Sequence, residues 1–112
     1  MSKLDDKIAL YTESAKKLGL ELEEEFIAKV TKALGPSIYN KDAESVSCSD
    51  SSELETVKKN FLLKKLELED SEALDAAIKK VCETLGSSNR NKYRALFYAL
   101  LAKEFGKESI YA

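Results

Sequence analysis

Residues 88–105 read Ser-Asn-Arg-Asn-Lys-Tyr-Arg-Ala-Leu-Phe-Tyr-Ala-Leu-Leu-Ala-Lys-Glu-Phe and precede Gly106. Apolar side chains recur here at the three- and four-residue spacing of a helix, at Tyr93, Leu96, Phe97, Leu100, Leu101 and Phe105. The stripe that they form is wider than any other in the chain, so several helices must pack around it to bury it. We therefore predict a helix near 89–105 at the centre of an all-helical domain.

Length and composition indicate one helical globular domain, residues 1–112. The chain is long enough for a single core, and it is 44% hydrophobic and 34% charged, with one Pro and four Gly. With 18 basic and 20 acidic residues, its formal net charge is −2. This balance provides no global attraction to nucleic acid or to an anionic membrane.

Four further helices are predicted before the last one, near 3–18, 21–34, 51–65 and 71–85. Their apolar residues share a face, and Gly19, Gly35 and Gly86 follow three of them. Asp50 and Glu53 form a weak capping box, in which Asp50 accepts from first-turn amides and Glu53 reaches back. The expected fold class is all-α: a five-helix orthogonal bundle, with two hairpins around the last helix.

An internal repeat accompanies this pattern. Residues 27–41 and 78–92 share I-x-K-V-x-x-x-L-G-x-S-x-x-N-K, with eight identities in fifteen positions. Two helix-hairpin repeats followed by a central C-terminal helix would explain it, as would two Leu/Lys/Glu helices that converged on the same capping chemistry. The residues leave both explanations open.

The connection 36–50 is rich in Ser, Asp and Asn, and it predicts an ordered loop with one helical turn after Pro36. Three apolar residues should hold it to the core: Ile38, Tyr39 and Val46. So long a connection is the preferred non-helical place for function, which makes Tyr39 and Asn40 candidate binding residues. In the tail, Ile110 and Tyr111 should dock on the body.

Cys48 and Cys82 show neither zinc-ligand spacing nor a disulfide framework. They can pair only if the fold brings them together, and we expect two free thiols in a reducing compartment. No apolar run long enough for a membrane span or a signal peptide is present, so we expect a cytoplasmic protein without a membrane partner.

Catalytic and cofactor signatures are missing from the sequence. The chain has no histidine, which removes the commonest general base and metal ligand, and no glycine-rich phosphate loop. The acidic residues at 21 and 23–25 fit a solvated first helical turn better than a metal site. We therefore expect no cofactor, no metal and no catalytic residue; an enzyme using Tyr39, Cys48, Cys82 or a carboxylate ranks third among the functions.

The only arginines, Arg90 and Arg94, lie one turn apart at the start of the last predicted helix. Cations there repel each other and oppose the helix dipole, so a partner should offset the cost. We favour an acidic neighbour, such as the 23–25 turn or Glu44, held by the guanidinium groups. The alternative is an external anion: phosphate, nucleic acid or a carboxylate.

The function expected first is a non-catalytic interaction or scaffold module that can associate with itself or with a protein partner. Surplus apolar area at Phe97 and Tyr98 would favour it. The alternative is anion or nucleic-acid binding, although the negative charge argues against nucleic acid. The candidate binding residues for these functions are Arg90, Asn91, Lys92, Tyr93, Arg94, Tyr39 and Asn40.

Three stretches resemble those of a family of small bacterial proteins that is catalogued only as a domain of unknown function. They are Gly-Pro-Ser-Ile-Tyr-Asn (35–40), Ser-Glu-Leu-Glu-Thr-Val-Lys-Lys-Asn-Phe-Leu-Leu-Lys-Lys-Leu (52–66) and Ser-Asn-Arg-Asn-Lys-Tyr-Arg-Ala (88–95). The similarity runs along nearly the whole chain. It implies an all-helical, bacterial, cytoplasmic protein, and it assigns no activity, cofactor or catalytic residue.

Overall fold

The computed structural model describes residues 3–86, 89 and 92–111. Its elements, in chain order, are α1 (Lys3–Leu18), α2 (Glu24–Leu34), the 3₁₀-helix η1 (Gly35–Tyr39), α3 (Lys41–Glu44), α4 (Ser51–Val57), the π-helix η2 (Lys58–Lys65), α5 (Glu72–Leu85), α6 (Arg94–Glu104) and the 3₁₀-helix η3 (Glu108–Tyr111). The described residues form no β-strand, so the all-α prediction is confirmed.

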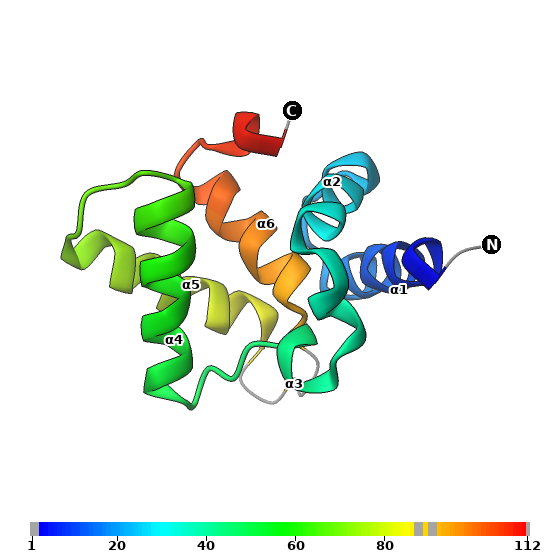
Figure 1. Cartoon of the computed structure of the whole chain (residues 1–112), viewed down its shortest axis with the longest axis horizontal. Helices are drawn as coiled ribbons and strands as arrows, with labels where there is room; N and C mark the ends of the chain where they lie inside the picture. Colours follow the sequence, from blue (N-terminus) through cyan, green and yellow to red (C-terminus); the bar gives the residue numbers. More distant parts are fainter. Residues whose placement is uncertain (1–2, 87–88, 90–91, 112) are drawn as a thin grey trace.

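Helix α6 lies at the centre of the molecule, between the α1–α2 hairpin and the pair formed by α4 and α5 (Figure 1). It packs against α2 and against α5. Six of its eleven residues are buried: Ala95, Leu96, Phe97, Ala99, Leu101 and Ala102. The predicted central helix is therefore confirmed, because only a helix surrounded on several sides can bury so wide a face.

The start of α6 differs from the prediction, since the helix begins at Arg94 and not near residue 89. The backbone before it is extended and pairs with the end of the predicted loop. Val46 N donates to Lys92 O at 2.8 Å, and Ser45 and Tyr93 form an isolated antiparallel bridge. This pairing holds Tyr93 out of helical geometry and delays the first turn. Likewise, α2 begins at Glu24 because Glu23 is extended.

The predicted helix 51–65 is a continuous rod, but its second half is the π-helix η2. Hydrogen bonds between residues five apart stack Val57 with Leu62, and Phe61 with Leu66. These four side chains are all buried, whereas Leu63 is only partly buried. An α-helix through these residues could bury either Leu62 or Leu63; the π register places Leu62 in the core.

The predicted loop 36–50 contains two short helices, η1 and α3. Ile38 and Val46 are buried, as expected, but Tyr39 is 46% exposed, so its predicted role as a core contact is wrong. In the tail, Tyr111 is buried against the body, whereas Ile110 is 37% exposed. Only one residue of each Ile-Tyr pair docks, because neighbouring side chains in so short a helical turn point in different directions.

Helix α6 does not offer the surplus apolar surface that was predicted. Phe97 is wholly buried, and the ring of Tyr98 stacks on Phe61 with 4.1 Å between centroids. Both aromatic side chains therefore belong to packing within the molecule.

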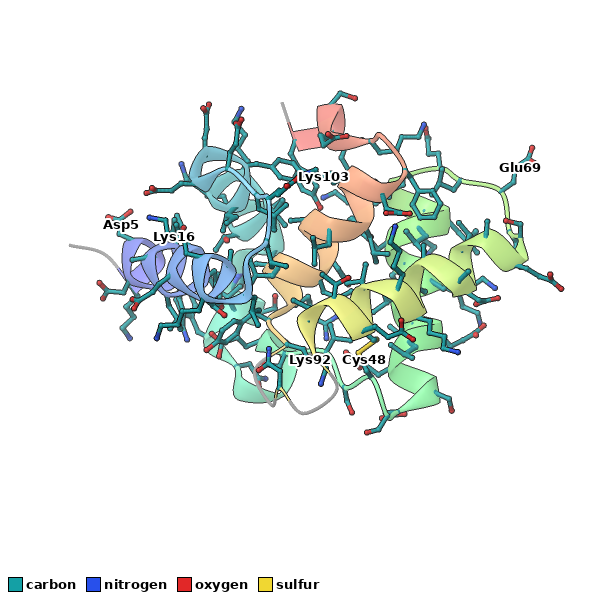
Figure 2. All side chains as sticks on the ribbon, turned by 180° about the vertical axis from the view of Figure 1, so that it is seen from behind. Asp5, Lys16, Cys48, Glu69, Lys92 and Lys103 are labelled. Carbon is teal, nitrogen blue, oxygen red and sulfur yellow. A yellow bond between two sulfur atoms is a disulfide. The ribbon has the colours of Figure 1, made fainter. Side chains whose placement is uncertain are left out.

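Cys48 and Cys82 form a disulfide, with 6.0 Å between their Cα atoms (Figure 2). The expectation of two free thiols is wrong for this structure. The loop that joins α3 to α4 runs beside the last turns of α5, and it brings together two cysteines that lie 34 positions apart. The 6.0 Å between the two Cα atoms lies within the range of about 4.4–6.8 Å that disulfides span.

The internal repeat can be compared only in part. Helices α2 and α5 both end at a glycine with positive φ, 67° at Gly35 and 98° at Gly86. A left-handed residue at this position favours glycine and satisfies the last helical carbonyls. The second copy then continues into 87–88 and 90–91, which lie outside the described residues, so both explanations of the repeat stay open.

Candidate functional site

The predicted binding residues surround the segment that leads into α6. Arg90 and Asn91 lie outside the residues that the structure describes. Lys92, Tyr93 and Arg94 are described, as are Tyr39 and Asn40 on the neighbouring connection. The two parts meet where residues 45–46 pair with residues 92–93.

Arg94 points into the molecule and donates hydrogen bonds to three elements. Its Nε donates to Ala43 O at 2.7 Å, its Nη1 to the Tyr98 hydroxyl at 3.1 Å, and its Nη2 to Glu53 Oε1. The Arg94 side chain is only 13% exposed. Burial acts to lower its pKa, but Tyr98 and Glu53 outweigh that effect and raise it, so the guanidinium stays charged. An acidic partner of Arg94 therefore exists, and it is Glu53 rather than residues 23–25 or Glu44.

The pairing of Glu53 with Arg94 changes the predicted cap of α4. Asp50 does cap the helix, since its Oδ1 accepts from Ser52 N at 3.0 Å and from Glu53 N at 3.4 Å. These bonds, with one from the Ser52 hydroxyl, lower the pKa of Asp50. The Glu53 carboxylate is engaged by Arg94, so the expected capping box is reduced to its Asp50 half.

A second polar cluster joins α1 to α3. Lys7 Nζ and the Tyr11 hydroxyl each donate to Glu44 Oε2 at 2.6 Å. Tyr11 is completely buried, and its ring lies 4.7 Å from that of Tyr93. Burial and the bond to Glu44 raise the pKa of Tyr11 above its ordinary value, and burial raises the pKa of Tyr93. Sequence reasoning missed this cluster, because Tyr11 appeared there only as one apolar residue of a helical face.

The remaining predicted residues do not converge on one ligand. Lys92 Nζ donates to Asn89 O at 2.6 Å, and Tyr93 is buried against Tyr11. The Asn40 carbonyl accepts from Ala43 N and Glu44 N and so begins α3, while Tyr39 is turned outward. The contacts of Arg94 and Glu44 together hold α3 in place from two sides. The role of these two residues in the fold is therefore structural.

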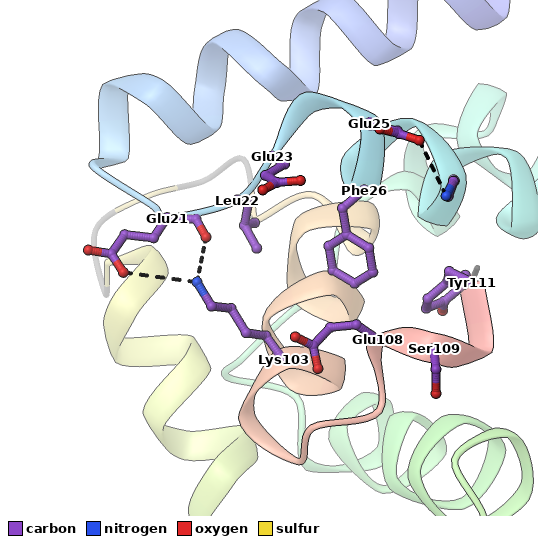
Figure 3. A pocket seen from close by; sticks show the side chains of 10 residues that line it. Glu21, Leu22, Glu23, Glu25, Phe26, Lys103, Glu108, Ser109 and Tyr111 are labelled. Atoms are coloured by element: carbon purple, nitrogen blue, oxygen red, sulfur yellow. Dashed lines mark hydrogen bonds and ion pairs between the residues drawn. The ribbon is translucent and has the colours of Figure 1, made fainter.

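One hollow of about 430 Å³ lies between the start of α2 and the tail (Figure 3). Its apolar part is Leu22, Phe26 and Tyr111, with the last two rings edge to face at 5.8 Å. Lysines occupy its charged border: Lys103 Nζ donates to Glu21 O at 2.5 Å, and Lys29 lies 3.4 Å from the Glu25 carboxylate. The border stays acidic, because Glu23 and Glu108 also line the hollow.

A second hollow, of about 350 Å³, opens beside the outer face of α1. We call its α1 wall the α1 stripe: Leu10, Glu13, Ser14, Lys17 and Leu18. Asn89 and Tyr93 form the opposite wall. Leu10 is 41% exposed and lies at the edge of this hollow. This hollow therefore borders the predicted region at the entrance to α6.

Among the residues that the structure describes, no three His, Cys, Asp or Glu side chains are grouped so that they could hold a metal ion. None of the helices described is both long and apolar enough to cross a membrane.

Comparison with known proteins agrees with the resemblance seen in the sequence. Residues 10–109 match the model of a family described as "Protein of unknown function (DUF2853)". Because the match covers most of the chain, the protein belongs to this family. A search of curated proteins found no match. The family has no assigned activity, and it supplies no evidence of catalysis.

Proposed function

We propose that this member of the DUF2853 family is a non-catalytic, cytoplasmic interaction module that pairs with a second copy of itself through the α1 stripe. The observation that carries the proposal is the exposure of Leu10 at the rim of a hollow. A contact between two copies would remove this side chain from water and fill the space beside it.

The charges of the α1 stripe favour a second copy over a strongly charged partner. Glu13 and Lys17 lie 3.6 Å apart, and their side chains are largely exposed. If two copies of α1 run antiparallel about a twofold axis near Ser14, Leu10 of each copy faces Leu18 of the other. The same operation leaves each Glu13 two residues, or roughly 3 Å along the helix axis, from the other copy's Lys17, which its side chain can span. A surface that complements itself in this way is what a symmetric dimer requires.

Anion binding receives less support, because the two cations proposed for it that the structure describes, Lys92 and Arg94, have partners within the chain. Arg94 donates to Ala43, Tyr98 and Glu53, and Lys92 donates to Asn89. An external phosphate would have to displace Glu53 and compete with a backbone carbonyl. The whole sequence has no histidine, which likewise favours a protein–protein contact over acid–base catalysis as the function.

Two matched variants test the proposed surface. Leu10→Asp places a charge in the contact, whereas Ile110→Asp makes the same change at an equally exposed aliphatic residue outside the α1 stripe. On size exclusion, the parent chain and Ile110→Asp should elute as dimers and Leu10→Asp as a monomer, all with the same helical circular dichroism. Identical elution of the two variants would show that the α1 stripe is not the contact.

A further inference from the structure

The disulfide between Cys48 and Cys82 lies in the wall of a surface groove. This groove, of about 390 Å³, runs between α4 and α5, and we call it the α4–α5 groove. Both cysteines line it and are partly exposed. Ser51, Leu54 and Ile78 line it as well. A small thiol can therefore approach the sulfur atoms without the core having to open, which is the first condition for exchange.

The charges that line the groove permit the approach of a negatively charged thiolate. Lys79 lines it one turn before Cys82, and a nearby cation favours a thiolate. Two carboxylates also line it, and each has a lysine beside it: Glu55 lies 3.7 Å from Lys59, and Asp75 lies 3.3 Å from Lys58. The negative charges that would repel a thiolate are thus partly neutralised.

The disulfide is one of two independent links across the α4–α5 groove, and the other is a set of ion pairs. Lys58 Nζ, at the start of η2, lies 2.8 Å from Asp70 and 3.3 Å from Asp75, which closes the other end. These carboxylates raise the pKa of Lys58, so the ammonium stays charged. The two helices therefore remain attached to each other when the disulfide is opened.

The connection that carries Cys48 also has anchors of its own. Arg94 holds Ala43 O, Val46 is buried, and Val46 N donates to Lys92 O at 2.8 Å. On the other side, α5 is fixed by the burial of Ile78, Val81 and Leu85. Opening the disulfide would release only residues 47–50, because Arg94 also holds Glu53 in the first turn of α4, and the fold would persist in both states.

From these observations we infer that Cys48 and Cys82 form a reversible thiol–disulfide exchange site for low-molecular-weight thiols. A thiolate attacks one sulfur and forms a mixed disulfide, while the other sulfur leaves as a thiolate and takes a proton. A second thiolate attacks the small-molecule sulfur of that mixed disulfide, and the released protein sulfur is protonated. The protein gains two thiols, and the two small thiols become one disulfide. Oxidised glutathione drives the reverse steps.

The test is to titrate the native chain with millimolar reduced glutathione and to trap thiols with N-ethylmaleimide. Mass spectrometry should find two N-ethylmaleimide adducts after reduction, and no such adduct after the chain is returned to oxidised glutathione. Helical circular dichroism should stay unchanged throughout. In oxidised glutathione, Cys48→Ser should instead keep one glutathione on Cys82, because the second protein thiol that would displace it and close the disulfide is missing.

Three results would overturn the inference. Adducts that form only in denaturant would mean that the disulfide is closed to small thiols. Loss of the helical signal on reduction would make it a structural cross-link. Two N-ethylmaleimide adducts in oxidised glutathione would mean that the disulfide between Cys48 and Cys82 does not form again. The Cys48→Ser/Cys82→Ser double variant supplies the folding control, since it should keep the helical signal without any thiol chemistry.

Discussion

Arg94, the first residue of α6, donates hydrogen bonds to Ala43 of α3 and to Glu53 of α4. It also donates to Tyr98, one turn further along α6. A guanidinium can do this because its donors point in several directions in one plane. The unfavourable position of a cation at a helix N-terminus is thereby offset by charge-assisted hydrogen bonds in a site that is largely shielded from water.

Arg94→Ala should lower the free energy of unfolding by about 2–4 kcal/mol, because it leaves Ala43 O and Glu53 without their donor. Urea denaturation followed by circular dichroism measures the change. Lys59→Ala is the matched control: its ion pair with Glu55 is exposed, so its loss should cost less than about 0.5 kcal/mol. Equal losses in the two variants would contradict a structural role for Arg94.

Tyr11 should make stability depend on alkaline pH. Its folded pKa is raised above that of the unfolded chain, so its contribution is complete below an unfolded pKa of about 10 and declines above it. Tyr11→Phe should be less stable at neutral pH, because Glu44 loses a donor, but the difference from the parent should shrink above that pH. Denaturation curves across this range measure it, and parallel pH profiles would refute the assignment to Tyr11.

At the scale of the element, η2 determines which face of the chain enters the core. The change from α to π winding rotates the later side chains, so residues five apart lie above one another. Leu62 is fully buried in this register, and its neighbour Leu63 lies at the edge of the core.

Leu62→Ala should therefore cost about 2–5 kcal/mol of unfolding free energy, the usual range for a buried leucine. Leu63→Ala makes the same chemical change one residue along and should cost clearly less, because less of its side chain leaves water in the folded state. Denaturant unfolding of both variants measures the difference. If Leu63→Ala proved the more damaging change, the π register would be incorrect.

The elements could be predicted from sequence where the signal is local. The stripe in α6, the Asp50 cap and the glycine after α5 each depend on residues within a few positions of one another. The π winding of η2 could not be predicted, since the same leucines also fit an α-helix. The start of α6 was misplaced because a tertiary pairing with residues 45–46 sets it.

The candidate site was harder to predict for the same physical reason. An acidic partner for Arg94 was expected from charge alone, but Glu53 lies 41 positions away, and only the docking of α4 beside α6 selects it. Cys48 and Cys82 are likewise joined by the path of a loop over α5. Tyr11 has no charged pattern that would reveal its bond to Glu44.

At the scale of the whole molecule, Arg94 and Tyr11 make polar contacts in the interior, whereas other ion pairs and a few apolar side chains lie at the surface. Arg94, one of the two arginines considered for an external anion, holds α3 and α4, and Leu10 lies at the rim of the hollow beside α1. This distribution is what makes self-association the proposed function, and an apolar contact should be insensitive to salt.

The most direct test of this account is the mass of the unmodified chain by light scattering, at rising concentration and at low and high salt. The account predicts a mass that approaches twice the 12.5 kDa of one chain at either salt concentration, without nucleic acid. A constant 12.5 kDa at every concentration would contradict self-association. A complex that carries nucleic acid at low salt and sheds it at high salt would contradict it as well, and would direct attention back to the entrance of α6.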